Sequence, residues 1–107
     1  MTGSGEVRQI VDSLRKESER ALGKNLLGMY LFGSYARGDF AGNSDIDVLI
    51  VVNEPLSKDM KEEMSRIVST LSLENDVVIA CIIYEKHLFD HVQSPFILNV
   101  KEEGIKL

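Results

Sequence analysis

The chain of 107 residues is long enough for one hydrophobic core and too short for two, so we expect residues 1–107 to form a single domain. Its hydrophobic content of 44% and charged content of 27% are typical of a soluble globular protein and exclude intrinsic disorder. The net charge of −5 argues against a sequence-independent grip on nucleic acid, so we expect no stable nucleic-acid binding.

The sequence also favours the cytoplasm. The lone Cys81 cannot form an internal disulfide, and the first residues contain neither the basic nor the apolar region of a signal peptide. No apolar run approaches the roughly 18 residues that span a membrane, so we expect no membrane association.

The first half of the chain predicts one helix, two strands and a helical turn. Apolar residues at helical spacing predict a helix over 6–21, and a short apolar run rich in aromatic residues predicts a strand over 26–32. A helical turn over 34–37 and a loop over 38–44, rich in Gly, Asn and Ser, precede a second strand over 45–52. The uninterrupted, mostly β-branched run in this second strand indicates burial on both faces.

The second half predicts further helices around a third strand. Ser57 is expected to cap a long amphipathic helix, and an apolar strand is expected over 77–84. A short helix over 85–91 and a last helix over 95–104 follow, with 105–107 as a tail. The resulting order predicts an α+β or mixed α/β domain with at least three strands.

Two carboxylates stand at the entrance of the buried second strand. Side chains alternate along a strand, so Asp45 and Asp47 point the same way, about 6.6 Å apart along the chain. This separation suits carboxylates that flank a pair of divalent cations, and hard oxygen ligands favour Mg²⁺ or Mn²⁺. The alternative is a solvated strand entrance in which Asp45 merely caps the preceding loop.

The turn before the loop is suited to phosphate. Gly33 has no Cβ and lets a phosphate approach the backbone, and Ser34 can offer a hydroxyl and the N–H groups behind it to an anion. One end of the stretch from 33 to 52 therefore favours phosphate and the other favours metal.

These residues carry a family resemblance. Gly33-Ser34, ten residues and then Asp45-x-Asp47 resemble the signature of the DNA polymerase β-like nucleotidyltransferase superfamily. The run GSYARGDFAGNSDIDVLIVV is similar to that of the minimal nucleotidyltransferases, and the resemblance extends in outline over nearly the whole chain. It implies the polymerase β-like fold, a small mixed sheet packed with helices.

The resemblance implies two further site residues. The superfamily usually adds a third carboxylate on a neighbouring strand, and Asp76 is the candidate by position, as a metal ligand and general base. The alternative is that Asp76 is only the turn residue after 74–75. Arg37 matches the family's basic residue, which either neutralises a nucleotide phosphate or pairs with Asp39 or an active-site aspartate.

The resemblance also implies a function. Minimal nucleotidyltransferases of this kind are paired with a HEPN-domain toxin and transfer AMP from ATP to a tyrosine of that partner. We therefore expect a Mg²⁺-dependent nucleotidyltransferase with two metal ions, acting as an antitoxin by protein adenylylation. The alternatives are a non-catalytic antitoxin that neutralises its partner by binding, and a small-molecule nucleotidyltransferase with an acceptor pocket formed in a homodimer.

Overall fold

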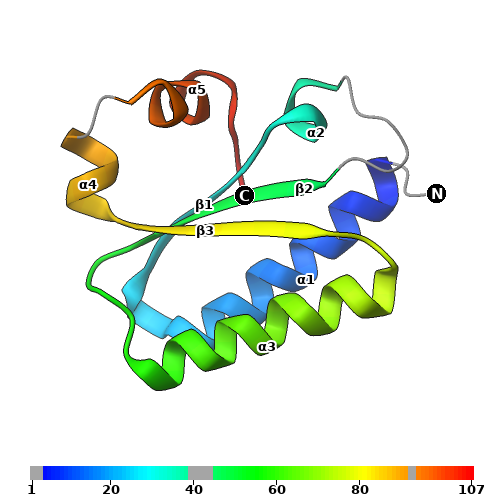
Figure 1. Cartoon of the computed structure of the whole chain (residues 1–107), viewed down its shortest axis with the longest axis horizontal. Helices are drawn as coiled ribbons and strands as arrows, with labels where there is room; N and C mark the ends of the chain where they lie inside the picture. The colour runs from blue at the N-terminus through cyan, green and yellow to red at the C-terminus, as the bar shows by residue number, and fades with distance from the viewer. Residues whose placement is uncertain (1–3, 39–44, 92–93) are drawn as a thin grey trace.

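A four-stranded sheet lies between two layers of helices in the computed structural model, which describes residues 4–38, 45–91 and 94–107 (Figure 1). The strand order is β3-β2-β1-β4, with β1 at Leu26–Phe32, β2 at Ile46–Val52, β3 at Ile79–Glu85 and β4 at Ile105–Lys106. Strand β1 is antiparallel to both β2 and β4, whereas β2 and β3 are parallel. The predicted mixed α+β fold is confirmed.

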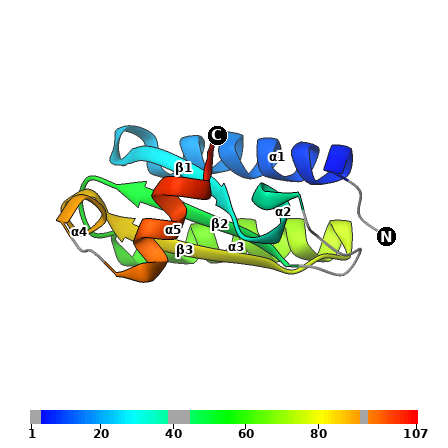
Figure 2. The same cartoon turned by 90° about the horizontal axis from the view of Figure 1, so that it is seen from above.

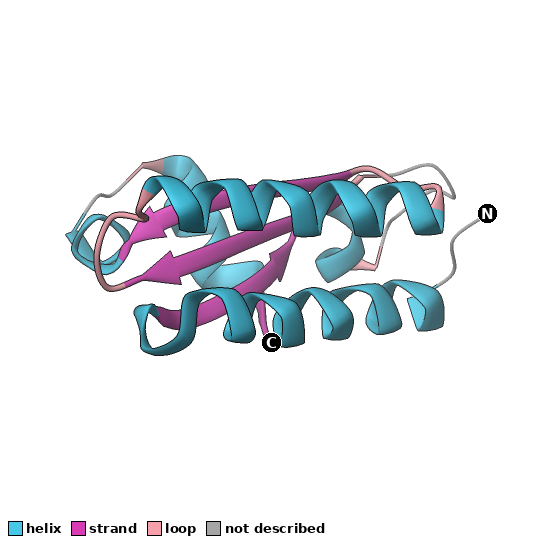
Figure 3. Cartoon of the chain, turned by 90° about the horizontal axis from the view of Figure 1, so that it is seen from below, coloured by secondary structure: helices cyan, strands magenta, loops and turns pink. Residues whose placement is uncertain are grey.

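Two long helices cover one face of the sheet. Helix α1 (Ser4–Leu22) and helix α3 (Lys58–Asn75) lie side by side and antiparallel there (Figure 3). A 3₁₀ turn, η1 (Gly23–Asn25), joins α1 to β1. None of the helices in the described ranges is long and apolar enough to cross a membrane.

Two short helices cover the opposite face. Helix α4 (Lys86–His91) and helix α5 (Pro95–Glu103) lie there, and α2 (Ser34–Arg37) follows β1 at the end of the sheet (Figure 2). Ser94 caps α5, because its hydroxyl accepts a hydrogen bond of 3.2 Å from the N–H of Ile97.

Strand β2 is buried on both faces, as its composition predicts. Alternate residues contact the helices α1 and α3: Ile46, Val48, Ile50 and Val52. Leu49 and Val51 point the other way, into a second cluster with Phe89, Ile97 and Val100. Asp47 shares this second direction, because side chains alternate along a strand. The site therefore opens on the face covered by α4 and α5.

The main differences from the expectations lie at the end of α3, at the start of β3 and in the C-terminal segment. Helix α3 continues through Asn75, so β3 begins at Ile79 and the predicted start at 77 is wrong. The expected tail 105–107 instead forms β4, in which Ile105 pairs with Leu31, and the N–H of Leu107 donates to the carbonyl of Met29 at 2.8 Å. The segment is too short to show the alternation of apolar and polar residues that identifies a strand. It pairs because the edge of β1 offers unpaired backbone N–H and C=O groups. Residues 39–44 of the predicted loop lie outside the described residues.

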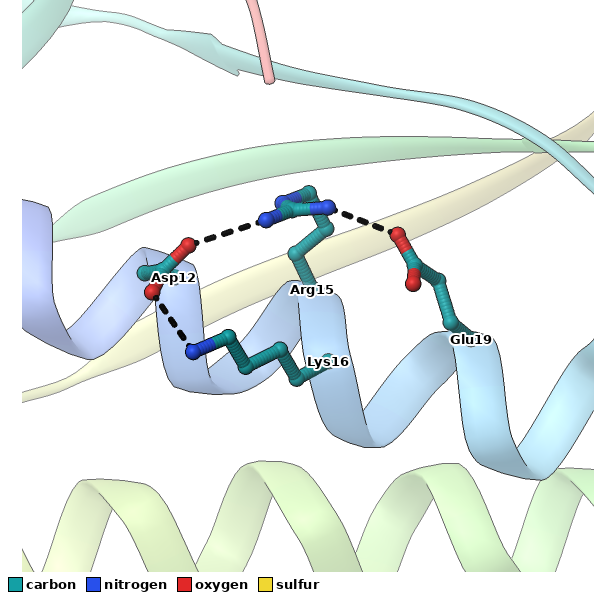
Figure 4. Close-up of polar contacts among 4 residues, drawn as sticks. All are labelled: Asp12, Arg15, Lys16 and Glu19. Atoms are coloured by element: carbon teal, nitrogen blue, oxygen red, sulfur yellow. Dashed lines mark hydrogen bonds and ion pairs between the residues drawn. The ribbon is translucent and has the colours of Figure 1, made fainter.

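On the outer face of α1, ion pairs join side chains that lie one helical turn apart (Figure 4). Arg15 contacts Glu19 at 2.8 Å and Asp12 at 3.1 Å, and Lys16 contacts Asp12 at 3.3 Å. Such exposed pairs contribute only about 0.2–0.5 kcal/mol each, so the buried side chains of α1 supply most of its stability.

Ser57 caps the N-terminus of α3, and its substitution tests how much this cap contributes to the free energy of unfolding. The N–H of Met60 donates to the Ser57 hydroxyl at 3.2 Å. We expect Ser57→Ala to lower the free energy of unfolding by about 1 kcal/mol, measured by chemical denaturation. Ser65→Ala, at an exposed position inside the same helix, should change it by less than about 0.5 kcal/mol. Equal losses in the two variants would contradict the cap.

Cys81, the only cysteine of the sequence, is half-buried on β3, and its reactivity reports on that burial. Burial raises the pKa of Cys81 to about 11, from an ordinary value of 9.0. At neutral pH the folded protein should therefore react with a disulfide reagent about 100-fold more slowly than the unfolded chain, because only the thiolate reacts. Stability should also fall as the pH rises from about 9 to about 11, where only the unfolded thiol ionises. Equal reaction rates in buffer and in denaturant would contradict this placement.

Candidate active site

The site forms where β1 ends and β2 begins. The two strands are antiparallel, so the last residue of β1, Phe32, pairs with Asp47 on β2. The chain then turns at Gly33 into α2, and the N–H of Arg37 donates to the carbonyl of Gly33 at 3.1 Å, closing the helical turn. This pairing brings together the two ends of the sequence motif.

Gly33 lies directly against the carboxylate of Asp47. Its φ of +77° is in the left-handed region, where residues with a side chain are strained. A Cβ at this position would overlap the Oδ2 of Asp47 and lie only 3.1 Å from its Cγ. The structure therefore requires glycine for two reasons, the backbone turn and the space beside the carboxylate.

Two carboxylates repel each other at this point. Asp45 is exposed and Asp47 is half-buried. Partial burial raises the pKa of Asp47 above its usual range, the charge of Asp45 raises it further, and the cation of Arg37 lowers it in part. A bound cation would relieve this repulsion. The donor set of carboxylate oxygens fits a hard divalent ion such as Mg²⁺.

Arg37 connects the site to α5. Its charge lowers the pKa of Asp47, whereas its contact with a nucleotide phosphate stays a prediction. Its Nη1 also lies 3.8 Å from the Oε2 of Glu103, a long and exposed ion pair. Glu103 is far away along the chain, so no local pattern indicates it. The other partner considered, Asp39, lies outside the described residues.

The remaining predicted phosphate residue is Ser34. It is the first residue of α2, as expected, but its side chain is outside the described part of the structure. Its contact with phosphate stays a prediction.

Asp76 is not beside the other two carboxylates. It ends α3 in the left-handed conformation, with a φ of 51°, and its side chain is exposed. Among the described residues, no three His, Cys, Asp or Glu side chains are placed to hold one metal ion. The structure therefore brings together Asp45 and Asp47 but not Asp76, because α3 is longer than expected and places the aspartate at its C-terminal cap.

Apolar residues of β3 lie next to the aspartates. In the parallel register of β2 and β3, Ala80 is the partner of Asp47. The carbonyl of Val78 accepts a hydrogen bond of 2.9 Å from the N–H of Ile46, which fixes this register at the entrance of β2. Sequence reasoning overlooked Ala80, because only the pairing of the two strands identifies it.

An aromatic cluster bounds the site toward α5. Phe32, the other neighbour of Asp47 in the sheet, contacts Phe96 edge-to-face with ring centroids 5.2 Å apart, and Tyr84 lies 6.2 Å from Phe96. These rings fix the end of β1 against α5 and so hold the turn at Gly33 in place. The alternation of Tyr30 and Phe32 along β1 is a sequence signal for this face.

A large cavity lies away from this site. It has a volume of about 910 Å³ and lies between α1 and the C-terminal segment, with Leu31 and Tyr35 on its wall. Neither aspartate nor Gly33 lines it, so volume does not identify the site. The contact between Gly33 and Asp47 does.

Comparison with known proteins agrees with this geometry. The family model described as "Nucleotidyltransferase domain" matches residues 7–107. A curated relative from Methanocaldococcus jannaschii, named "Putative protein adenylyltransferase MJ0141", is 36% identical over 102 residues, covering 95% of this chain and 99% of its own length.

Solved structures share the fold. A toxin–antitoxin complex with AMP-PNP is 21% identical with a TM-score of 0.62, covering 94% of this chain and 70% of the other. The tri-AMPylated Shewanella oneidensis HEPN toxin in complex with MNT antitoxin gives 17% and 0.61, with coverage of 94% and 70%. Spectinomycin adenyltransferase AAD(9) from Enterococcus faecialis, with ATP and spectinomycin, gives 26% and 0.70, covering 82% of this chain and 38% of that one. The resemblance inferred from the motif is confirmed at the level of the family, and the chain belongs to the nucleotidyltransferase domain family.

Proposed function

We propose that this nucleotidyltransferase transfers AMP from ATP to a hydroxyl group of a partner protein, a tyrosine of a HEPN toxin, and thereby acts as an antitoxin. The observation that supports it most is the contact of Gly33 with Asp47, beside Asp45, because it joins a phosphate approach to a divalent-metal site. The curated relative named for protein adenylylation and the toxin–antitoxin fold neighbours support the acceptor.

In the proposed reaction, the acceptor oxygen forms a bond to the α-phosphorus of ATP, and the bond from that phosphorus to the bridging oxygen of pyrophosphate breaks. Pyrophosphate leaves, and the hydroxyl proton passes to water. Asp45 and Asp47 would hold two Mg²⁺ ions, with Mn²⁺ as a possible substitute. Bound there, the ions would activate the acceptor hydroxyl and stabilise the charge on the leaving group.

The chain's own residues bind and orient the nucleotide. Gly33, which has no Cβ, would let the β- and γ-phosphates approach the backbone, and a side chain at this position would displace the carboxylate of Asp47. Arg37, whose charge acts on Asp47, would offset the negative charge of a triphosphate beside the two aspartates. The ring cluster of Phe32 and Phe96 fixes these groups against α5.

A small-molecule acceptor is a second candidate, favoured by the likeness to the spectinomycin enzyme. The match covers 38% of that enzyme, so most of its length has no counterpart in the comparison. We therefore rank this activity below protein adenylylation.

The direct test is intact-mass measurement of the HEPN partner after incubation with the protein, ATP and Mg²⁺. We expect the partner to gain AMP units on tyrosine. Asp47→Asn should lower the rate by about 100-fold or more, because it removes a charged metal ligand. Glu62→Gln, an exposed site on α3, is the matched control and should retain the rate.

If the Asp45→Asn/Asp47→Asn variant still neutralised the partner at equal stoichiometry and left it unmodified, the result would contradict the proposal. It would favour neutralisation by binding alone. Transfer of AMP to spectinomycin but not to the partner protein would favour the second candidate.

Two glycines allow the phosphate role to be separated from backbone strain. Gly33 and Gly38 both have a positive φ, of 77° and 81°, so alanine should strain each by about 1–2 kcal/mol. Only at Gly33 would the new Cβ meet Asp47, since no atom of the described residues lies within 4 Å of a Cβ at Gly38. We expect Gly33→Ala to weaken the binding of an ATP analogue by about tenfold or more, measured by calorimetry. Equal affinities in the two variants would show that the contact with Asp47 does not matter.

A further inference from the structure

We infer that Ala80 occupies the position on β3 where a third carboxylate would complete the metal site, and that the protein therefore binds divalent cations tightly only together with a triphosphate. This inference rests on the proposed function, because it assigns the metal site to Asp45 and Asp47. It goes further by stating that phosphate oxygens of the nucleotide, and no third protein carboxylate, complete the set of metal ligands.

The first observation is the register in which β2 and β3 pair. Ala80 is the partner of Asp47 across β2 and β3, and side chains of paired residues on neighbouring parallel strands project from the same face, about 4.8 Å apart. A carboxylate at this position could share a cation with Asp47. Alanine supplies no oxygen there.

No other residue of β3 can replace it. The residues that share a face with Ala80 are apolar or aromatic: Val78, Ile82 and Tyr84. Strand β3 is also an edge of the sheet, so no further strand lies beyond it among the described residues (Figure 1). Asp76 belongs to the exposed cap of α3 and is not grouped with the two aspartates.

The position is open enough to accept a larger side chain. Ala80 is half-buried, and its neighbours on this face, Val78 and Ile82, are 60% and 36% exposed. The alanine is therefore not required by close packing. Its effect is to leave the cation with two protein carboxylates.

Magnesium completes such a site with phosphate. In proteins Mg²⁺ keeps several waters and is commonly held by one or two carboxylates together with substrate phosphates. The backbone turn at Gly33, beside Asp47, is where those phosphates would approach. Two carboxylates and a triphosphate would then form one coordination set, which neither the protein nor the nucleotide provides alone.

The test is titration of nucleotide-free protein with Mn²⁺, with free Mn²⁺ measured by electron paramagnetic resonance. We expect weak binding to the wild type and binding tighter by about tenfold or more in Ala80→Asp, because ligand charge sets the affinity for hard cations. Ala80→Asn, which has the same size without the charge, should stay within about twofold of the wild type. Thermal unfolding with and without Mn²⁺ gives a second readout, since a bound ion raises the midpoint.

Asp76→Asn provides an independent variant that should fold, because the position is exposed and asparagine tolerates the left-handed conformation. We expect no change in its affinity for Mn²⁺, with or without an ATP analogue. A tenfold loss in Asp76→Asn, or a folded Ala80→Asp that binds no tighter than the wild type, would overturn the inference. If Asp45→Asn/Asp47→Asn left the binding of Mn²⁺ with the ATP analogue unchanged, the proposed metal site itself would be wrong.

Discussion

The contact between the turn glycine Gly33 and the carboxylate of Asp47 is the constraint around which this structure is arranged. It exists because β1 and β2 are antiparallel, with Phe32 paired to Asp47, so the end of one strand meets the beginning of the next. A shift of one residue in this register would turn Asp47 to the opposite face of the sheet. The long-range pairing of two apolar strands thus sets the distance between the phosphate approach and the metal ligands.

Burial fixes that register. Strand β2 contributes to two separate hydrophobic clusters, one under α1 and α3 and the other under α4 and α5. A slip of the strand would disrupt both. The same burial makes the charge of Asp47 unfavourable beside Asp45, which is a cost that a divalent cation removes. Stability of the fold and affinity for a cation are therefore linked at one residue.

Much of this arrangement could be predicted from the sequence. The bounds of β1 and of α2, and the caps at Ser57 and Ser94, follow from local composition and hydrogen-bonding chemistry. The motif spacing identified the family. Its local signals are strong because glycine, serine and paired aspartates have few structural reasons to recur at these positions.

The parts that escaped prediction depend on contacts between distant segments. An acid before an apolar run predicts a metal ligand at Asp76, whereas the structure has this residue as the C-terminal cap of α3. Ala80 has no local signal, and only the parallel pairing with β2 shows that it lies beside Asp47. The ion pair of Arg37 with Glu103 and the pairing of β4 likewise join segments that no sequence window contains.

One measurement tests the central claim most directly: a crystal structure with Mn²⁺ and a non-hydrolysable ATP analogue, in which anomalous scattering locates the metal. We predict Mn²⁺ bound by Asp45 and Asp47 and by phosphate oxygens of the analogue, with the phosphates against the backbone of Gly33 and no ligand from Asp76. Metal and nucleotide bound away from the junction of β1 and β2 would contradict it.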